Sequence, residues 1–411
     1  MSKREKGHMK MLQNKFKKYK QYHLSQGSNI TEVLPDKLQC DFIRVDELGH
    51  KVFAFKPSQR FENLKEMYDN IRNTYDPNEL IDFVQVNPFY PEAVYDLGEF
   101  FRLKGNFKEA NKLLERVMFL YEDSFDYDFK VFDNELDNIV TLDYDYNNFT
   151  SLFFKAIFKF IAILTKKGCY QSSLEFNKLL LKLNPSKDPL GALLYIDHTA
   201  LSARKYEFFE NFAKNFANHY LNVPSGEPKS ILLYPSVVYS MALTKLMRVL
   251  DDCQSSKTEP NKQLAIVNDE SLLKIPEVEI STTNDSSFWL ALAYLLYPSL
   301  LQGILEETEL SKQACSHSAF KGWQKKSWLE ISQHSISMRS TSDYVYHFLG
   351  GGDDEDFEGL DKVIKIYAMR NKLLWRHKNA NLWMKAVVGQ LLNLVDEKRL
   401  NADSFLEMLI L

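Results

Sequence analysis

The sequence predicts an all-α protein built from tetratricopeptide-like helical hairpins, with a C-terminal helical region and a small β-hairpin near the N-terminus. Two observations carry this prediction. Apolar residues recur at intervals of three and four along much of the 411-residue chain, which is the period of a helix with one buried face. Pairs of such segments, joined by short turns, also repeat at the length of a tetratricopeptide unit, about 34 residues.

The predicted hairpin comes first along the chain. Residues 42–45 and 52–55 contain alternating apolar side chains on either side of a turn that includes Gly49. From Phe61 the spacing of apolar residues changes to three and four, so residues 61–75 are predicted to form a helix.

The next segment, residues 94–117, matches a tetratricopeptide hairpin most closely. Small residues stand where two helices approach each other, and large apolar residues stand where the space between them must be filled. The matching positions are Leu97, Gly98, Phe101, Gly105, Phe107, Ala110, Leu114 and Val117.

Two further units follow at residues 153–185 and 190–220. In the unit at residues 153–185, the turn is at Gly168 and Pro185 ends the second helix. In the unit at residues 190–220, the turn contains Arg204 and has no glycine. Between the first and second units, residues 123–150 alternate acids with aromatics. They are interpreted either as an insertion packed along the repeats or as a binding loop.

These patterns predict four regions. Residues 1–40 form a basic arm expected to be flexible, and residues 41–250 a tetratricopeptide-like α-solenoid. Residues 251–285 are polar, with two prolines, and form a linker. Residues 286–411 form the C-terminal helical region, with helices at residues 288–305, 360–375 and 382–395.

Charge is distributed unevenly along the chain. The net charge is −4, but the first twenty residues contain eight basic residues and one acidic residue. A basic arm on an acidic body is typical of proteins that contact RNA phosphates through the arm. The alternative is that these residues form a solvated tail that binds no partner. The predicted RNA contacts are Lys15, Lys17, Lys18 and Lys20.

Composition also indicates the cellular compartment in which the chain is expected. The four cysteines show no CxxC pair and no histidine spacing of a zinc site, as expected in a reducing compartment. The N-terminus has no apolar signal segment, and no apolar run is judged long enough to span a membrane. The chain is therefore expected in the cytoplasm or nucleus, without a membrane partner.

The sequence contains none of the common catalytic motifs, which predicts that the chain is not an enzyme and holds no cofactor or metal. The glycines at 350–352 precede acids rather than the Lys-Ser/Thr of a phosphate-binding loop, and no nucleophile elbow, zinc-protease or dinucleotide fingerprint occurs. Adjacent Asp197 and His198 point about 100° apart on a helix, so we interpret them as packing residues rather than as a catalytic pair. Cys315 and His317 are rejected as a nucleophile and base for a similar reason.

One block of sequence resembles a known family. Residues 174–207, with Asp188-Pro189-Leu190, Ile196-Asp197-His198 and Tyr206-Glu207, are similar to the signature block of the transcription factor 25 family. Its fungal members are called ribosome quality control complex subunit 1. Further similarity occurs at residues 87–90, 142–144, 167–169 and 360–375, in the same order as in the family.

The resemblance implies a non-catalytic subunit of the ribosome-associated quality control complex, located in the cytoplasm on stalled large ribosomal subunits. The implied partners are a Listerin-type RING E3 ubiquitin ligase, ubiquitin, the large ribosomal subunit and the AAA segregase known as valosin-containing protein. The implied outcome is degradation of the stalled nascent chain. The alternative is a generic tetratricopeptide-like scaffold in the nucleus with a role in transcription.

Candidate partner-binding residues come from the signature block and the C-terminal helices. Arginine and tryptophan are often interface hot spots, but ordinary helix packing is the alternative for residues spaced by three and four. A basic cluster of Arg370, Lys372, Arg376, His377 and Lys378 is the alternative contact for ribosomal RNA. The predicted partner-binding residues are Asp197, His198, Arg204, Tyr206, Tyr367, Arg370, Trp375 and Trp383.

Overall fold

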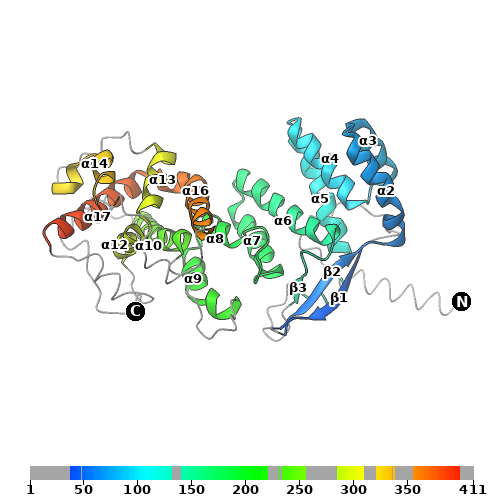
Figure 1. Ribbon diagram of the computed structural model, residues 1–411, viewed down its shortest axis with the longest axis horizontal. Coiled ribbons are helices and arrows are strands. Elements are labelled where there is room, and N and C mark those ends of the chain that lie inside the picture. The colour runs from blue at the N-terminus through cyan, green and yellow to red at the C-terminus, as the bar shows by residue number, and fades with distance from the viewer. Residues whose placement is uncertain are drawn as a thin grey trace, which may run out of the picture. The chain divides into compact units, whose positions relative to one another are not determined.

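The computed structural model describes residues 38–47, 49–131, 140–220, 231, 234–255, 285–309, 321–335, 337 and 355–398. The chain divides into two compact units, Met1–Ala192 and Leu193–Leu411, each described here by itself (Figure 1). The division falls within the segment 41–250, for which the sequence predicts one solenoid. The predicted all-α fold with a small N-terminal hairpin is confirmed.

The first unit begins with a small sheet. Strands β1 (Gln39–Val45) and β2 (Lys51–Lys56) are antiparallel, with a bulge between Phe42 and Arg44, which confirms the predicted hairpin. A third strand, β3 (Val140–Leu142), pairs with β2 in parallel and brings Leu142 opposite Phe53. The sequence did not predict β3, because three residues are too few to show an alternating pattern.

Helices α2 to α7 complete the first unit. Several begin at a residue whose side-chain oxygen accepts a hydrogen bond from a free backbone N–H, as Ser58, Asp76, Asn106 and Asn147 do. The helices are α2 (Gln59–Thr74), α3 (Pro77–Val86), α4 (Pro91–Leu103), α5 (Phe107–Asp123), α6 (Asn148–Lys166) and α7 (Tyr170–Leu183).

An aromatic cluster joins the sheet to the helices. The ring of Phe55 on β2 lies edge-on to Tyr121 of α5, at 4.8 Å between centroids, and to Phe153 of α6, at 5.3 Å. The buried Tyr121 hydroxyl donates to the Phe149 carbonyl at 2.6 Å. Within the insertion at 123–150, Phe129 is buried and contacts Phe53. The described part of that insertion therefore packs on the first unit.

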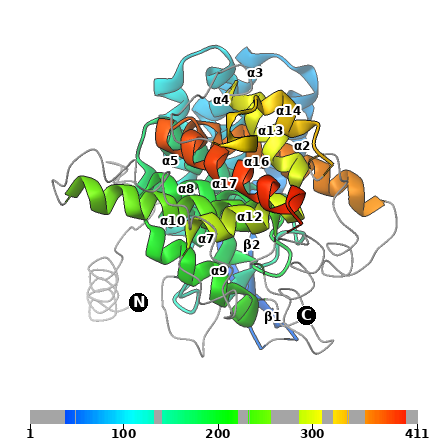
Figure 2. The same ribbon diagram turned by 90° about the vertical axis from the view of Figure 1, so that its left-hand side faces the viewer.

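The second unit contains the third hairpin and the C-terminal helices (Figure 2). The sequence predicted one helical stretch at 288–305, but the structure has two helices, bent by 104° at Pro298, which has no N–H to continue the first helix. The elements are α8 (Leu193–Ser202), α9 (Tyr206–Tyr220), α10 (Pro235–Ser255), α12 (Ser286–Leu296), α13 (Pro298–Thr308), the short 3₁₀ helix η4 (Gly322–Lys325), α14 (Trp328–Ser332), α16 (Glu355–Trp375) and α17 (Lys378–Asp396).

The core of the second unit includes helix α12, which is buried on all sides, and four tryptophans. Every residue of α12 from Ser287 to Leu296 is buried, as expected of a core helix. The side chains of Trp289, Trp328, Trp375 and Trp383 are also fully buried. The predicted helices at 360–375 and 382–395 correspond to α16 and α17.

The turns inside the three hairpins share one geometry. Gly105, Gly168 and Arg204 all have positive φ, at 79°, 77° and 55°. At each turn this residue donates its N–H to the carbonyl three residues earlier, and the next residue donates to the carbonyl five residues earlier. This is the Schellman helix end, in which glycine is favoured because it has no side chain to clash. Arg204 fills the glycine position in the third hairpin.

The expectation that no apolar run is long enough to span a membrane is wrong for one described helix. Helix α6 is long and apolar enough to cross a bilayer by length and composition, and the bent pair α12 and α13 passes the same test together. Half of the apolar window of α6 is buried inside the structure, and core helices of soluble proteins meet the same criteria.

Candidate functional site

The structure brings several of the predicted site residues together in the second unit. Asp197 and His198 lie on α8, and Tyr367, Arg370 and Trp375 lie on α16. Helix α10 packs against both of these helices and adds Ser240. The two segments that resemble the family, around residues 197 and 370, therefore meet in one cluster, called here the Asp197 cluster. It comprises Asp197, His198, Ser240, Tyr367, Arg370, Asn371 and Trp375.

The Asp197 carboxylate is the centre of this cluster. Its Oδ2 accepts a hydrogen bond from Ser240 Oγ at 2.9 Å and another from Asn371 Nδ2 at 3.0 Å. Its Oδ1 is buried without a hydrogen-bond partner among the described residues. Burial raises the pKa of Asp197, while hydrogen bonds from the His198 backbone, Ser240 and Asn371 act in the opposite direction.

A chain of hydrogen bonds extends from the carboxylate to α16. Tyr367 Oη lies 3.1 Å from Ser240 Oγ and accepts a hydrogen bond from Trp375 Nε1 at 3.3 Å. A serine hydroxyl has one hydrogen, and that of Ser240 is donated to Asp197. Ser240 Oγ thus lies between the Asp197 carboxylate and Tyr367 Oη, and Trp375 extends the chain of hydrogen bonds at the tyrosine oxygen.

His198 joins the cluster through Asn371. The His198 Nδ1 lies 3.1 Å from Asn371 Oδ1. Because Asn371 uses its NH₂ group for Asp197, its oxygen faces the imidazole, and Nδ1 must carry the hydrogen. The imidazole also stacks on Tyr195, with 5.4 Å between ring centroids. Burial lowers the pKa of His198, although the charge of Asp197 favours its protonated form.

Arg370 points toward α8 rather than away from the protein. Its Nη1 donates to the Leu194 carbonyl at 2.8 Å, and its guanidinium lies over the ring of Tyr195, 4.7 Å from the centroid. Burial lowers its pKa, and the charge of Asp197 opposes that effect. Arg370 thus connects α16 to the first turn of α8.

The arrangement is suited to holding three helices in register. The hydroxyl of Ser240 is bonded to a carboxylate and the imidazole of His198 to an amide, so the hydroxyl and imidazole are not paired as in a serine hydrolase. A buried polar network whose members bond to one another specifies one packing of its helices. This agrees with the interpretation of Asp197 and His198 as packing residues.

The remaining predicted residues lie in different surroundings. Trp383 is fully buried, and its Nε1 donates to Ser287 Oγ at 3.2 Å. Arg204 is exposed at the turn between α8 and α9, where its Nη1 lies 3.7 Å from Asp251 Oδ2. Tyr206 donates to the same oxygen at 3.0 Å. The predicted RNA contacts Lys15, Lys17, Lys18 and Lys20 lie outside the described residues.

The rings of Tyr367, Trp375 and Trp383 are buried in this fold, which is the packing alternative stated for them from the sequence. Partner binding by these residues stays a prediction. Among the predicted partner-binding residues, the structure leaves Arg204 the most exposed, with 71% of its side chain accessible.

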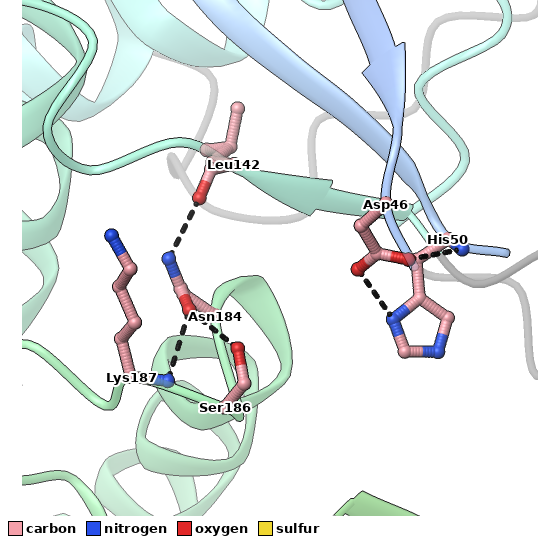
Figure 3. Close-up of polar contacts among 6 residues, drawn as sticks. All are labelled: Asp46, His50, Leu142, Asn184, Ser186 and Lys187. Atoms are coloured by element: carbon pink, nitrogen blue, oxygen red, sulfur yellow. Dashed lines mark hydrogen bonds and ion pairs between the residues drawn. The ribbon is translucent and has the colours of Figure 1, made fainter. Parts of the chain in front are cut away.

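The signature block also includes a loop in the first unit (Figure 3). At the end of α7, Asn184 Nδ2 donates to the Leu142 carbonyl of β3 at 3.1 Å, and its Oδ1 accepts from the Lys187 backbone at 3.3 Å. Further along, Asp188 Oδ1 accepts from the Ala192 N–H at 2.7 Å while its φ is positive, at 38°. Side chains thus fix the loop that follows α7.

Sequence reasoning missed Ser240, Asn371 and Asn184. Each is a single polar residue without a motif. Ser240 offered the clearest signal, because it is a polar residue within the apolar run at 237–243 of α10. A polar side chain on a buried helix face needs a partner, and here that partner is Asp197.

Comparisons with known proteins agree on one family. The family model described as "Transcriptional repressor TCF25" matches residues 53–408. The human protein "Ribosome quality control complex subunit TCF25" is 23% identical over 349 residues, covering 85% of this chain and 43% of the relative. "Ribosome quality control complex subunit 1" of Saccharomyces cerevisiae is 26% identical over 160 residues, covering 38% of this chain and 21% of the relative.

A third relative has a different name. "Probable transcription factor claV" of Ampulloclitocybe clavipes is 26% identical over 231 residues, covering 56% of this chain and 28% of that protein. The chain therefore spans less than half the length of these relatives. No solved structure matches it significantly.

Proposed function

Because the chain belongs to the Tcf25 family, we propose that it acts as a non-catalytic subunit of a ribosome quality control complex. The observation that carries this proposal is the match of the family model over residues 53–408, together with the names of the human and yeast relatives. The family expected from the signature block is thereby confirmed.

The non-catalytic part of the proposal is supported by the Asp197 cluster. Its acid, imidazole and hydroxyls contact one another across α8, α10 and α16 and lie in the interior. These groups are used to fix helix packing. The chain would then act by holding partners in a productive orientation, which accelerates a reaction between them without any bond chemistry of its own.

The proposed partners are those implied by the family: a Listerin-type ligase, ubiquitin, the large ribosomal subunit and the AAA segregase. The proposed location is accordingly the cytoplasm, on ribosomes. The exposed face of α16 is our first choice for a contact. Met369 and Leu373 are 49% and 67% exposed there, Lys365 is exposed on the same face, and Arg376 is exposed directly after the helix ends. Apolar groups beside basic groups suit a protein partner or ribosomal RNA.

Sedimentation tests the proposal. The full chain, incubated with purified large ribosomal subunits that carry a stalled nascent chain, is expected to move with them in a sucrose gradient. A protein that stays in the light fractions, with or without the ligase, would contradict it.

The α16 face is tested in the same assay by Lys365→Glu, Leu373→Ser and Arg376→Glu combined. The matched control is Lys321→Glu with Lys325→Glu, two lysines at η4 outside this face. Loss of co-sedimentation or of ligase capture only in the first variant is expected. If both activities survive the triple change, the face is excluded as the contact.

One observation favours a second candidate function. The family description and the Ampulloclitocybe clavipes relative both refer to transcription. A nuclear scaffold of this kind predicts recovery with chromatin rather than with large subunits after cell fractionation, which separates the two candidates.

A further inference from the structure

The first unit contains a pocket that shares no residue with the Asp197 cluster. It has a volume of about 230 Å³ and is formed by α2, the turn after it, the start of α3 and the middle of α4. This is smaller than the roughly 300–1,000 Å³ of most small-molecule sites. A pocket of that size suits one anchoring side chain of a peptide rather than a cofactor.

The wall of the pocket is largely apolar and includes an unusually placed tyrosine. Ile71, Leu80 and Phe100 contribute side chains that are neither fully buried nor fully exposed. Tyr75 is 90% exposed and has φ of 55°, the left-handed conformation that ends α2. Leu103, three positions after Phe100 on α4, is 87% exposed. Apolar surface therefore continues past the rim.

The charge around the pocket is negative. Asp76 and Asp96 line it against one basic residue, Arg72, whose Nε lies 3.7 Å from Asp96 Oδ2. Glu92 lies close by on α4: burial raises the pKa of its carboxyl, and the charges of Asp69 and Asp96 raise it further. A cation that approaches this site therefore meets an excess of carboxylates.

The chain itself contains a segment of complementary chemistry. The first twenty residues carry seven net positive charges, and residues 15–20 read Lys-Phe-Lys-Lys-Tyr-Lys. Phe16 has no polar atom in its side chain, so an apolar pocket can bury it without leaving a hydrogen-bonding group unpaired. Flanking lysines would face the surrounding carboxylates.

The length of chain permits this contact. Eighteen residues separate Lys20 from Gln39, where β1 begins, and fully extended they span at most about 65 Å. A compact unit of this size has a radius of gyration of roughly 15 Å. The arm and the pocket belong to one chain, so their effective concentration is in the millimolar range for a short connection.

We propose that residues 15–20 dock intramolecularly on the pocket of α2, α3 and α4, with the Phe16 ring as the anchor in the apolar pocket and the flanking lysines facing the carboxylates around it. This surface does not depend on the proposed role at the ribosome. Its consequence is that lysines available for RNA contact are held against the body of the protein while the arm is docked.

Photo-crosslinking in the full chain tests the proposal. Phe16 is replaced by p-benzoylphenylalanine, and the crosslinked peptides are identified by mass spectrometry. The expected crosslinks are to the segment 71–80 or to Phe100. Leu80→Lys should lower their yield about tenfold, as expected for losing the burial of one large side chain. Val86→Lys is the matched control, since Val86 is 73% exposed on the same helix and does not line the pocket.

A second variant tests the pocket in case Leu80→Lys loses the crosslink only because it misfolds. Tyr75→Gly removes one wall of the pocket at a position where glycine adopts the observed backbone more easily than tyrosine does, so it should fold and still lose the crosslink. An equal mixture of isotopically heavy and light chains distinguishes contacts within one chain from contacts between copies. Crosslinks mainly between copies, crosslinks scattered over other surfaces, or yields unchanged by Leu80→Lys would each overturn the proposal.

Discussion

At the scale of single residues, the stability of the second unit depends on which protons its buried groups hold. His198 has a pKa below its ordinary value of 6.5 because burial disfavours the imidazolium ion. The unfolded chain therefore binds a proton near pH 6.5 that the folded chain does not. Linkage then requires the free energy of unfolding to fall as pH drops below 6.5.

We predict that His198→Asn weakens this pH dependence. The asparagine amide can donate to Asn371 Oδ1 in place of Nδ1–H, but it does not titrate. The contribution of Asp197 to the pH dependence of the free energy of unfolding has the opposite sign. Because its pKa is raised, the folded state takes up a proton at higher pH than the unfolded state, which adds stability toward lower pH. Urea unfolding at about pH 7.5 and about pH 5.5 compares the variant with the wild type across the titration range of histidine. Equal losses in the two proteins would exclude His198 as the titrating group.

At the scale of secondary-structure elements, the three hairpin turns provide a direct comparison. Arg204 adopts a left-handed backbone that costs a residue other than glycine about 1–2 kcal/mol. Its ion pair with Asp251 is exposed and contributes about 0–1 kcal/mol.

We therefore predict that Arg204→Gly is more stable than Arg204→Ala by about 1 kcal/mol, although both lose the same ion pair. Chemical denaturation of the two variants measures the difference. Gly168→Ala should lose a similar amount in the first unit, since Gly168 has the same φ and hydrogen bonds. Equal stability of the two Arg204 variants would show that backbone strain at this turn is negligible.

The elements also show how far the sequence could predict the fold. Long segments with helical period, such as residues 360–375, were predicted because many residues repeat the same signal. The break at Pro298 was missed because apolar residues continue on both sides of it, and β3 because it is too short. The pairing of Asp197 with Asn371 was also missed, since period describes one helix and does not say which helices pack together. The pocket beside Tyr75 is missed for the same reason.

At the scale of the whole molecule, division into two compact units predicts two unfolding transitions. All five tryptophans lie in the unit Leu193–Leu411, so their fluorescence reports on that unit, whereas circular dichroism reports on both. Asn371→Leu removes a hydrogen bond from the buried Asp197 carboxylate and should cost about 3 kcal/mol, lowering the midpoint seen by fluorescence.

The matched variant for the first unit is Phe153→Ala, which removes a fully buried ring and should cost about 3–5 kcal/mol. It should shift the dichroism curve and leave the fluorescence midpoint unchanged. One coincident transition for both probes, moved equally by both variants, would show that the chain unfolds as a single cooperative unit.

The late pairing of β3 with β2 has a consequence for synthesis of the chain. Leu142, where β3 ends, is 86 positions after Lys56, where β2 ends, so at ordinary elongation rates the partner strand is complete roughly 4–17 s later. Asn184, which bonds to Leu142, is another 42 residues further on. During that interval one edge of β2 has no partner, and an unpaired strand edge can pair with other chains. The edge of β2 that later pairs with β3 is therefore open to contact with other chains during this part of translation.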